Sequence, residues 1–352
     1  MAVRQPLLAR EPTRVLSGSF LLGNTILGAG MLSLPSAFAA TGWLLATPLL
    51  LLFAAASTCA LAMLSECADQ VGRPSSFHAV ANTAMPGFAA LFDAAIAIKC
   101  FGVATSYLVV VGDSMPKAMV ALGLGGALLE RRLWVGASLA IAAPLAYRGR
   151  ISALRHISLA AVGFVLLIVI MALLYALQPF YPFSQPCEAE AELSECRGST
   201  QLLTSTGQTL RALPLFVFPF TCHQNMISIT NELARPTRAR CWAVAALSIG
   251  AAMVLYLVLS SSGYATFGDK SDILSNYPSD SVVVALARVM ISFKVHPTRA
   301  CITSMIEASS IGKTLSASSM HLFLTTLFVL ITATIAFLLS DLGLVLSVSH
   351  TS

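Results

Sequence analysis

The chain has 352 residues, of which 57% are hydrophobic and only 11% are charged, and its mean hydropathy is +0.80. Because a soluble domain carries about 25% charged residues, this composition excludes an ordinary soluble protein and predicts a polytopic protein of the lipid bilayer. The net charge of +5 does not indicate a nucleic-acid partner, since the basic residues lie in short loops between apolar stretches.

Apolar stretches long enough to cross a bilayer recur along the chain. A hydrocarbon core of about 30 Å requires roughly 20 residues of helix, and on this scale we predict about nine transmembrane helices. They cover roughly residues 16–40, 43–65, 89–114, 133–147, 157–177, 209–231, 241–267, 281–301 and 320–347. The fold class that follows is an all-α polytopic membrane protein.

The first span contains the segment FLLGNTILGAGMLSLP, in which Gly23, Gly28, Gly30 and Pro35 interrupt an apolar sequence. In a helix interior glycine costs about 1 kcal/mol and proline about 3 kcal/mol relative to alanine. We therefore predict a broken helix, with the break around Leu27–Gly30. The alternative is one tightly packed helix whose glycines only let neighbouring helices approach closely.

Ionisable residues inside a bilayer are functional candidates by default. Lys99 lies about ten residues into the third span, and Lys294 lies near the end of the eighth. Either amine could take the place of a coupling cation or titrate in a proton-driven cycle. The alternative for both is snorkelling to the interface, and this explanation fits Lys294 better than Lys99. Asp113, at the far end of the third span, could cap the helix or form an ion pair.

The loop at residues 178–208 separates the fifth span from the sixth. Most loop Lys and Arg residues fall on the same side as the N-terminus, so the positive-inside rule predicts a cytosolic N-terminus and places this loop outside the cytosol. The loop is acidic and contains Cys187 and Cys196. An oxidising compartment would permit a disulfide between them; the alternative is two unpaired thiols.

The sixth span carries Pro214 and Pro219 and should also kink or break. A polar cluster follows: Thr221, His223, Gln224 and Asn225. Interrupted helices at matching places in two halves are the best sequence indication of a transport site, and their ends suit the carboxylate and amine of an amino acid. We expect the two breaks to lie in contact. The alternative for the cluster is a polar helix end near the interface.

Several motifs are absent from the sequence. It has no Walker-type GxxxxGK[ST], no HExxH, no paired CxxC spacing and no GxSxG. Because these motifs mark nucleotide, metal and nucleophile sites, we predict that the chain is not an enzyme or an ATP-driven pump, and that it holds no metal.

Three stretches and a short motif together resemble one family. They are GNTILGAGMLSLP in the first span, KCFGVATSYLVVVGDSMP in the third, FVFPFTCHQNMISITNEL in the sixth and HPTR in the eighth. They resemble the amino acid/auxin permease family, in particular the vacuolar amino acid exporters of fungi and the sodium-coupled neutral amino acid transporters. This resemblance implies the LeuT-like inverted-repeat fold of the amino acid–polyamine–organocation superfamily, with substrate and ion between spans 1, 3, 6 and 8.

The resemblance also assigns substrate-binding residues by position. In the unwound part of the first span, where backbone groups would do much of the binding, it points to Asn24, Thr25, Leu27, Gly28, Ala29 and Gly30. In the sixth span it points to Phe218, Thr221 and the neighbouring CHQN, which contains Asn225.

The coupling ion implied by the resemblance is a proton or sodium. The family's sodium site usually uses a hydroxyl residue in the eighth span, and the matching segment ARVMISFKVHPTR offers Ser292, with Lys294 close by. This departure favours protons. The candidate coupling residues are therefore Lys99, Ser292 and Lys294, and no other cofactor is expected.

The family pattern has two repeats of five helices and an eleventh helix. We place the first repeat at 16–177, an extracytosolic loop at 178–208 and the second repeat at 209–347, with tails at 1–15 and 348–352. About nine spans instead of eleven predict a C-terminal truncation that leaves the second repeat incomplete.

The resemblance predicts a secondary active transporter of amino acids that works by alternating access, with a bundle containing spans 1 and 6 rocking against the rest. We expect a vacuolar or other endomembrane location, with the plasma membrane as the alternative, and no obligate protein partner. The alternative function is a non-transporting amino acid sensor, or a truncated and inactive form of such a transporter.

Overall fold

The computed structural model describes residues 14–147, 154–179, 183, 186–187, 197–270, 276–278, 281–292 and 317–338. Over these residues the protein is all-helical and contains no β-strand, as the sequence predicts. The α-helices are α1 (Val15–Ile26), α2 (Leu34–Thr41), α3 (Trp43–Val71), α4 (Phe77–Ala84), α5 (Ala89–Ala121), α6 (Arg131–Tyr147), α7 (Leu154–Leu177), α9 (Thr206–Val217), α10 (His223–Asn231), α11 (Arg238–Phe267), α13 (Val282–Ser292) and α15 (Ala317–Leu338). Short 3-10 helices are η1 (Ala29–Ser33), η2 (Gly126–Leu129), η3 (Phe218–Phe220) and η4 (Gly268–Lys270).

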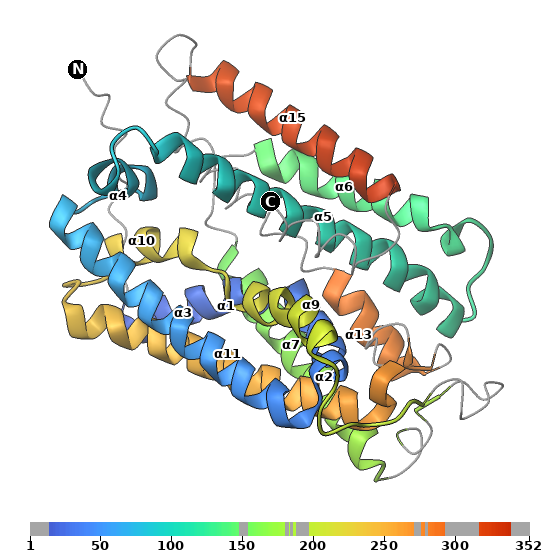
Figure 1. Ribbon diagram of the computed structural model, residues 1–352. Coiled ribbons are helices and arrows are strands. Elements are labelled where there is room, and N and C mark those ends of the chain that lie inside the picture. The colour runs from blue at the N-terminus through green and yellow to red at the C-terminus, as the bar shows by residue number, and fades with distance from the viewer. Residues whose placement is uncertain are drawn as a thin grey trace.

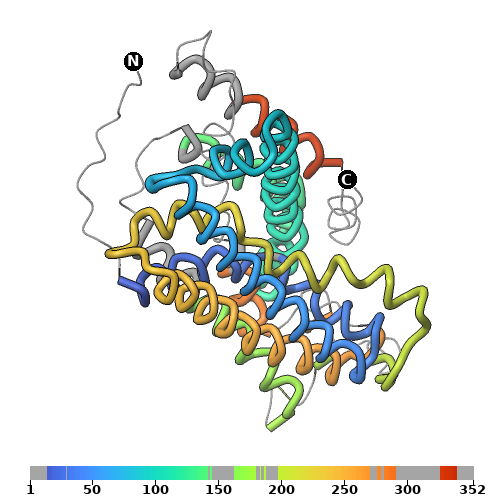
Figure 2. Tube along the Cα trace, turned by 60° about the vertical axis from the view of Figure 1, so that its left-hand side comes forward, coloured from blue at the N-terminus to red at the C-terminus, as the bar shows by residue number. Residues whose placement is uncertain are grey.

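Two long helices, α5 and α11, organise the molecule (Figures 1 and 2). Helix α11 packs against α1, α2, α3 and α7, whereas α5 packs against α6, α13 and α15. Helix α13 also packs against α7 and joins the two groups. The interrupted segments α1–η1–α2 and α9–η3–α10 pack with the α11 group, and η1 contacts both η3 and α5.

Within the described part of the chain, α3, α5 and α11 are each long and apolar enough to cross a membrane. The segments Val15–Ile26 and Gly30–Thr41 pass the same test as a pair, with a bend of 56° between them. Of the predicted spans 281–301 and 320–347, the structure describes α13 and α15.

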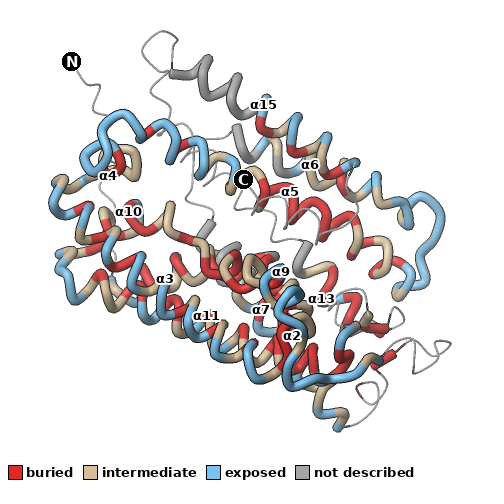
Figure 3. Tube along the Cα trace, in the orientation of Figure 1, coloured by how far each residue is buried: buried red, intermediate tan, exposed pale blue. Residues whose placement is uncertain are grey.

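Many residues on these helices are exposed, which Figure 3 colours pale blue, and large apolar side chains are among them. Examples are Leu52 and Met63 on α3, Leu91 on α5, Val254 on α11 and Leu330 on α15. Contiguous exposed apolar surface of this kind would be unfavourable in water, and it matches helices whose outer faces contact lipid. The chain is therefore a multi-pass membrane protein.

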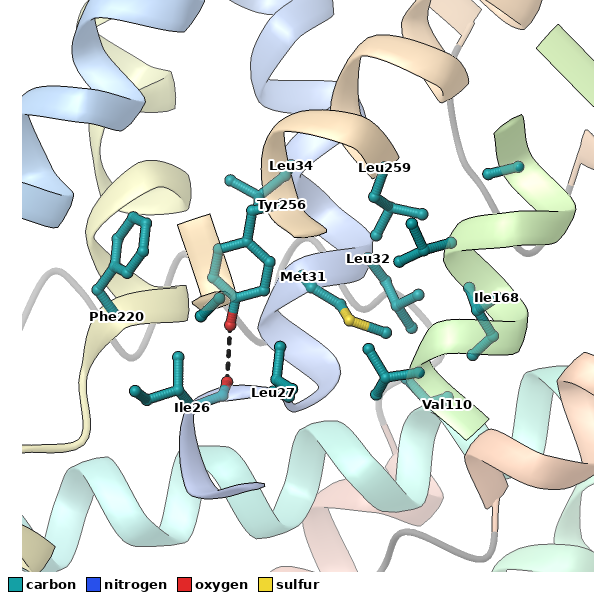
Figure 4. Close-up of a cluster of buried hydrophobic side chains, with 14 of the residues drawn as sticks. Ile26, Leu27, Met31, Leu32, Leu34, Val110, Ile168, Phe220, Tyr256 and Leu259 are labelled. Carbon is teal, nitrogen blue, oxygen red and sulfur yellow. Dashed lines mark hydrogen bonds between the residues drawn. The ribbon is translucent and has the colours of Figure 1, made fainter. Parts of the chain in front are cut away.

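The buried core lies around the break of the first span (Figure 4). Met31 of η1 and Leu34 of α2 meet Val110 of α5, Ile168 of α7 and Leu259 of α11 in one cluster of buried side chains. Helices from both groups thus meet at the break, and the packing fixes its position in the fold.

Helix α4 follows α3 and was not predicted from the sequence, because it is too short to cross a membrane. Its N-terminus is capped by Ser76, whose hydroxyl accepts a hydrogen bond from the backbone N–H of Ala79 at 3.1 Å. The cap explains the start of the helix, since a serine at this position satisfies a free N–H.

A polar network around Arg73 joins the end of α3 to the end of α10. The Arg73 guanidinium donates to the hydroxyl of Thr230 at 2.7 Å and to that of Ser65 at 2.9 Å, and it pairs with Asp69. Its side chain is only 13% exposed. Hydrogen bonds to charged groups contribute more than neutral ones when they are shielded from water, so this network should stabilise the position of α10.

We expect Arg73→Met to lower the free energy of unfolding by about 2–3 kcal/mol, since it removes charge-assisted hydrogen bonds and leaves their partners unsatisfied. Arg238→Met is the matched control. Arg238 pairs with Glu66 at 2.7 Å but is 74% exposed, so its loss should cost at most about 1 kcal/mol. Equilibrium unfolding in mixed detergent micelles measures both, and equal effects would contradict the stabilising role of the Arg73 network.

Candidate functional site

The first break lies where the sequence predicts it. Helix α1 ends at Ile26, and the chain is then non-helical at Leu27 (φ −69°, ψ 83°) and extended at Gly28 (φ −131°, ψ −165°) before η1 begins at Ala29. The prediction of a break around Leu27–Gly30 is confirmed. The backbone at Gly28 is one that any residue adopts, so this glycine is not required by its φ angle.

The two glycines of the break instead allow close contacts. A Cβ atom on Gly28 would lie 2.5 Å from the Tyr107 hydroxyl oxygen, and one on Gly30 would lie 2.7 Å from Cδ1 of Phe218. Around Gly23 nothing lies within 4 Å. The alternative of one continuous helix is therefore wrong, because the span is broken, although Gly28 and Gly30 do let neighbouring side chains approach closely.

The second break is also where the sequence predicts it. Helix α9 contains Pro214 and ends at Val217, η3 contains Pro219, and α10 begins at His223. Between η3 and α10 the backbone of Thr221 is extended (φ −79°, ψ 91°), and its hydroxyl donates to the carbonyl of Phe218 at 2.7 Å. The prediction of a kink or break in this span is confirmed.

The two breaks lie in contact, as expected from the sequence. Gly30 and Phe218 face each other closely enough that no Cβ fits at position 30. The Asn225 side-chain amide donates to the Thr25 hydroxyl at 3.3 Å, which joins α10 to α1. The residues assigned to substrate binding are therefore brought together, whereas their binding role stays a prediction.

Lys99 reaches the second break from α5. Its Nζ donates to the backbone carbonyl of Thr221 at 2.8 Å, and the residue is half-buried. The amine therefore contacts the protein's own backbone. The carbonyl that it contacts lies at a helix break, and such carbonyls bind coupling ions in transporters with broken helices.

The other charged candidates lie elsewhere. Ser292 is the last described residue of α13, a helix that packs against α5. Lys294 lies outside the described residues, so the coupling role of this region stays a prediction. Asp113 accepts a hydrogen bond from Nε of Arg131 at 2.8 Å, which confirms pairing as its role.

Three buried residues with polar groups were missed in the sequence, and two of them, Tyr107 and Tyr256, lie at the site. Tyr107 is buried and places its hydroxyl beside Gly28. Tyr256 of α11 is fully buried, and its hydroxyl lies between the carbonyls of the two breaks. Arg288 of α13 is fully buried and donates to the carbonyl of Tyr277 at 2.8 Å. Of the three, only Arg288 carries a sequence signal, as a single charge in the apolar segment VVVALARVMIS.

Within the described ranges, no group of three or more His, Cys, Asp or Glu side chains could hold a metal.

Cys187 is disulfide-bonded; Cys196 lies outside the described residues, so the pairing of these two stays a prediction. Among the described residues, five other cysteines form no disulfide: Cys100, Cys222 and Cys241, which are buried, and Cys59 and Cys67, which are exposed on α3.

Comparisons with known proteins show which sequences this chain resembles. The sequence profile described as "Transmembrane amino acid transporter protein" matches residues 11–349. The chain is 35% identical over 342 residues to vacuolar amino acid transporter 5 of Schizosaccharomyces pombe, covering 93% of this chain and 77% of that protein. It is 32% identical over 307 residues to vacuolar amino acid transporter 6 of Saccharomyces cerevisiae, covering 83% and 66%. It is 26% identical over 298 residues to sodium-coupled neutral amino acid transporter 7 of Danio rerio, covering 80% and 61%.

Proposed function

The chain belongs to the family of transmembrane amino acid transporter proteins, and from this we propose that it is a secondary active transporter of amino acids. Membership of a transporter family also confirms the prediction that the chain is not an enzyme. The substrate would bind between the two broken helices, at the residues named above.

The observation that carries this proposal is the contact between the two breaks. Each break exposes the carbonyl end of one helix segment and the N–H end of the next. The partial charges at these ends suit a carboxylate and an ammonium group at the same time. An amino acid carries both groups on one carbon atom, so two breaks in contact, at Gly28–Gly30 and at Phe218–Thr221, form a binding site of the right chemistry.

Lys99 is the proposed coupling residue. In the proposed cycle the protonated amine holds the carbonyl of Thr221, which Nζ contacts at 2.8 Å. Loss of the proton removes the attraction between the charge and the carbonyl and so weakens this contact, and a substrate ammonium group then competes for the carbonyl. Proton release on one side of the membrane would thus change the site, and no sodium ion is needed for this step.

The proposed motion is a rocking of one group of helices against the other. Helices α1, α2 and α3 pack on α11, whereas α6, α13 and α15 pack on α5, so the broken helices would move with the α11 group, which meets the α5 group where η1 contacts α5 and α13 contacts α7. This arrangement supports a LeuT-like fold with inverted repeats at 16–177 and 209–347, each of which begins with a broken helix.

The proposed location is a vacuolar or other endomembrane, with the N-terminus in the cytosol. Two of the similar proteins are described as vacuolar transporters. The extracytosolic loop at 178–208 would then lie in the lumen, and the disulfide at Cys187 is consistent with an oxidising compartment.

The test is amino acid flux in vesicles reconstituted with this chain. We expect labelled neutral amino acids to accumulate when a proton gradient is imposed, and a protonophore to abolish the accumulation. A sodium gradient alone should drive none. Vesicles without protein set the background.

Each other outcome has a definite meaning. Flux that follows sodium and not protons would contradict proton coupling but keep the transporter. Binding of amino acids without any flux, in either gradient, would replace the transporter with an amino acid sensor. Absence of both binding and flux would contradict the proposed site.

A further inference from the structure

One fully buried side chain contacts both broken helices. The hydroxyl oxygen of Tyr256 lies 2.7 Å from the carbonyl oxygen of Ile26 and 3.1 Å from that of Pro219. Ile26 is the last residue of α1, and Pro219 lies in η3. Figure 4 shows Tyr256 beside Phe220, with its hydroxyl directed at Ile26.

The Tyr256 hydroxyl cannot donate a hydrogen bond to both carbonyls at once. A tyrosine hydroxyl has one proton to donate, and a carbonyl can only accept. The hydroxyl can therefore satisfy only one of the two carbonyls at a time, and the shorter distance favours Ile26. A carbonyl at the end of a helix has lost its intrahelical donor, and unsatisfied backbone groups are strongly unfavourable in the membrane interior.

The position of the hydroxyl is set by α11. The ring of Tyr256 packs against Phe220 with 5.3 Å between ring centroids, and α11 is one uninterrupted helix that packs on α1, α2 and α3. The hydroxyl therefore cannot follow one break away from the other without leaving its packed position.

We propose that Tyr256 is a positioning residue that couples the two breaks, so that the distance between the two halves of the substrate site stays constant and both move together with α11. At any moment its hydroxyl donates a hydrogen bond to the carbonyl of either Ile26 or Pro219. The consequence for transport rests on the proposed function, whereas the coupling of the two breaks does not.

Tyr264 offers a matched control on the same helix. It is also fully buried, and its hydroxyl lies 2.7 Å from the backbone nitrogen of Gln201 and 3.3 Å from the carbonyl of the same residue. Tyr264→Phe therefore removes the same group from α11 but affects the segment around Gln201. Both Phe variants keep the aromatic ring, so both should fold.

Hydrogen exchange in lipid nanodiscs, without any substrate, tests the coupling. We expect Tyr256→Phe to raise the exchange rate of amides in residues 27–31 and 220–223 by about tenfold, since one hydrogen bond is lost. Tyr264→Phe should leave both segments unchanged and affect residues near 201. Unchanged exchange in Tyr256→Phe, or an equal rise in Tyr264→Phe, would overturn the proposal.

Amino acid binding and flux, measured on the same samples, test the consequence. Tyr256→Phe should weaken binding about tenfold and slow flux, and Tyr264→Phe should do neither. Loosened breaks with normal binding and flux would overturn the positioning role. If the unmodified chain binds and moves no amino acid, the proposed function fails, and hydrogen exchange still decides the coupling.

Discussion

A Gly30→Val variant should lose more than 90% of amino acid flux (roughly tenfold or more) while it still reaches the membrane. A Cβ at this position would lie 2.7 Å from Cδ1 and 2.9 Å from Cε1 of Phe218, and 3.3 Å from Cα of Pro219. Valine adds two methyl groups beyond that Cβ. The ring of Phe218 is itself buried, so η3 would have to move away from η1, and the two halves of the site would separate.

The matched control is Gly23→Val in the preceding helix. Nothing lies within 4 Å of a Cβ at Gly23, so the same substitution in α1 should leave flux close to that of the unmodified chain. Flux is measured per molecule of reconstituted protein, with the amount in the membrane determined by immunoblot. Normal flux in Gly30→Val would show that contact between the breaks is not required, and an equal loss in Gly23→Val would point to a general effect on the first span.

The breaks could be predicted from the sequence because the cost of glycine and proline in a helix is local. Gly28 and Pro219 lie at the interruptions, whereas Pro214 lies inside α9, so it is several such residues within one span that indicate a break. The tertiary contacts around these residues could not be predicted in the same way. The close approach of Tyr107 to Gly28 and of Phe218 to Gly30 depends on which helices become neighbours, and that information is tertiary.

The need for tertiary information also explains why some residues were missed in the sequence. A buried tyrosine such as Tyr256 looks like any other apolar residue of a membrane helix until its hydroxyl is seen between two carbonyls. Lys99 was found because a charge in an apolar span is rare and costly. Its partner, the carbonyl of Thr221, is a backbone group, and backbone partners leave no trace in the sequence.

A Lys99→Met variant should lose proton-driven accumulation of amino acids by at least about tenfold while it keeps exchange of amino acid across the membrane. Methionine has nearly the shape of lysine but cannot be charged, so the carbonyl of Thr221 is permanently free of the ammonium that now contacts it at 2.8 Å. The site would then bind and release substrate without any proton step. The pH dependence of exchange, measured by counterflow at equal pH on both sides, should flatten.

Two further variants distinguish a coupling role of Lys99 from a structural role. Lys99→Arg keeps a permanent charge, because a guanidinium does not lose its proton in proteins, so it should slow accumulation and exchange together. Lys117→Met makes the same change as Lys99→Met near the other end of α5 and should leave both rates unchanged. If Lys99→Met kept proton-driven accumulation, the proton would have to act elsewhere. If Lys99→Met lost exchange as fully as proton-driven accumulation, the contact between Lys99 and Thr221 would be structural. Removing a coupling residue should lower accumulation while exchange persists.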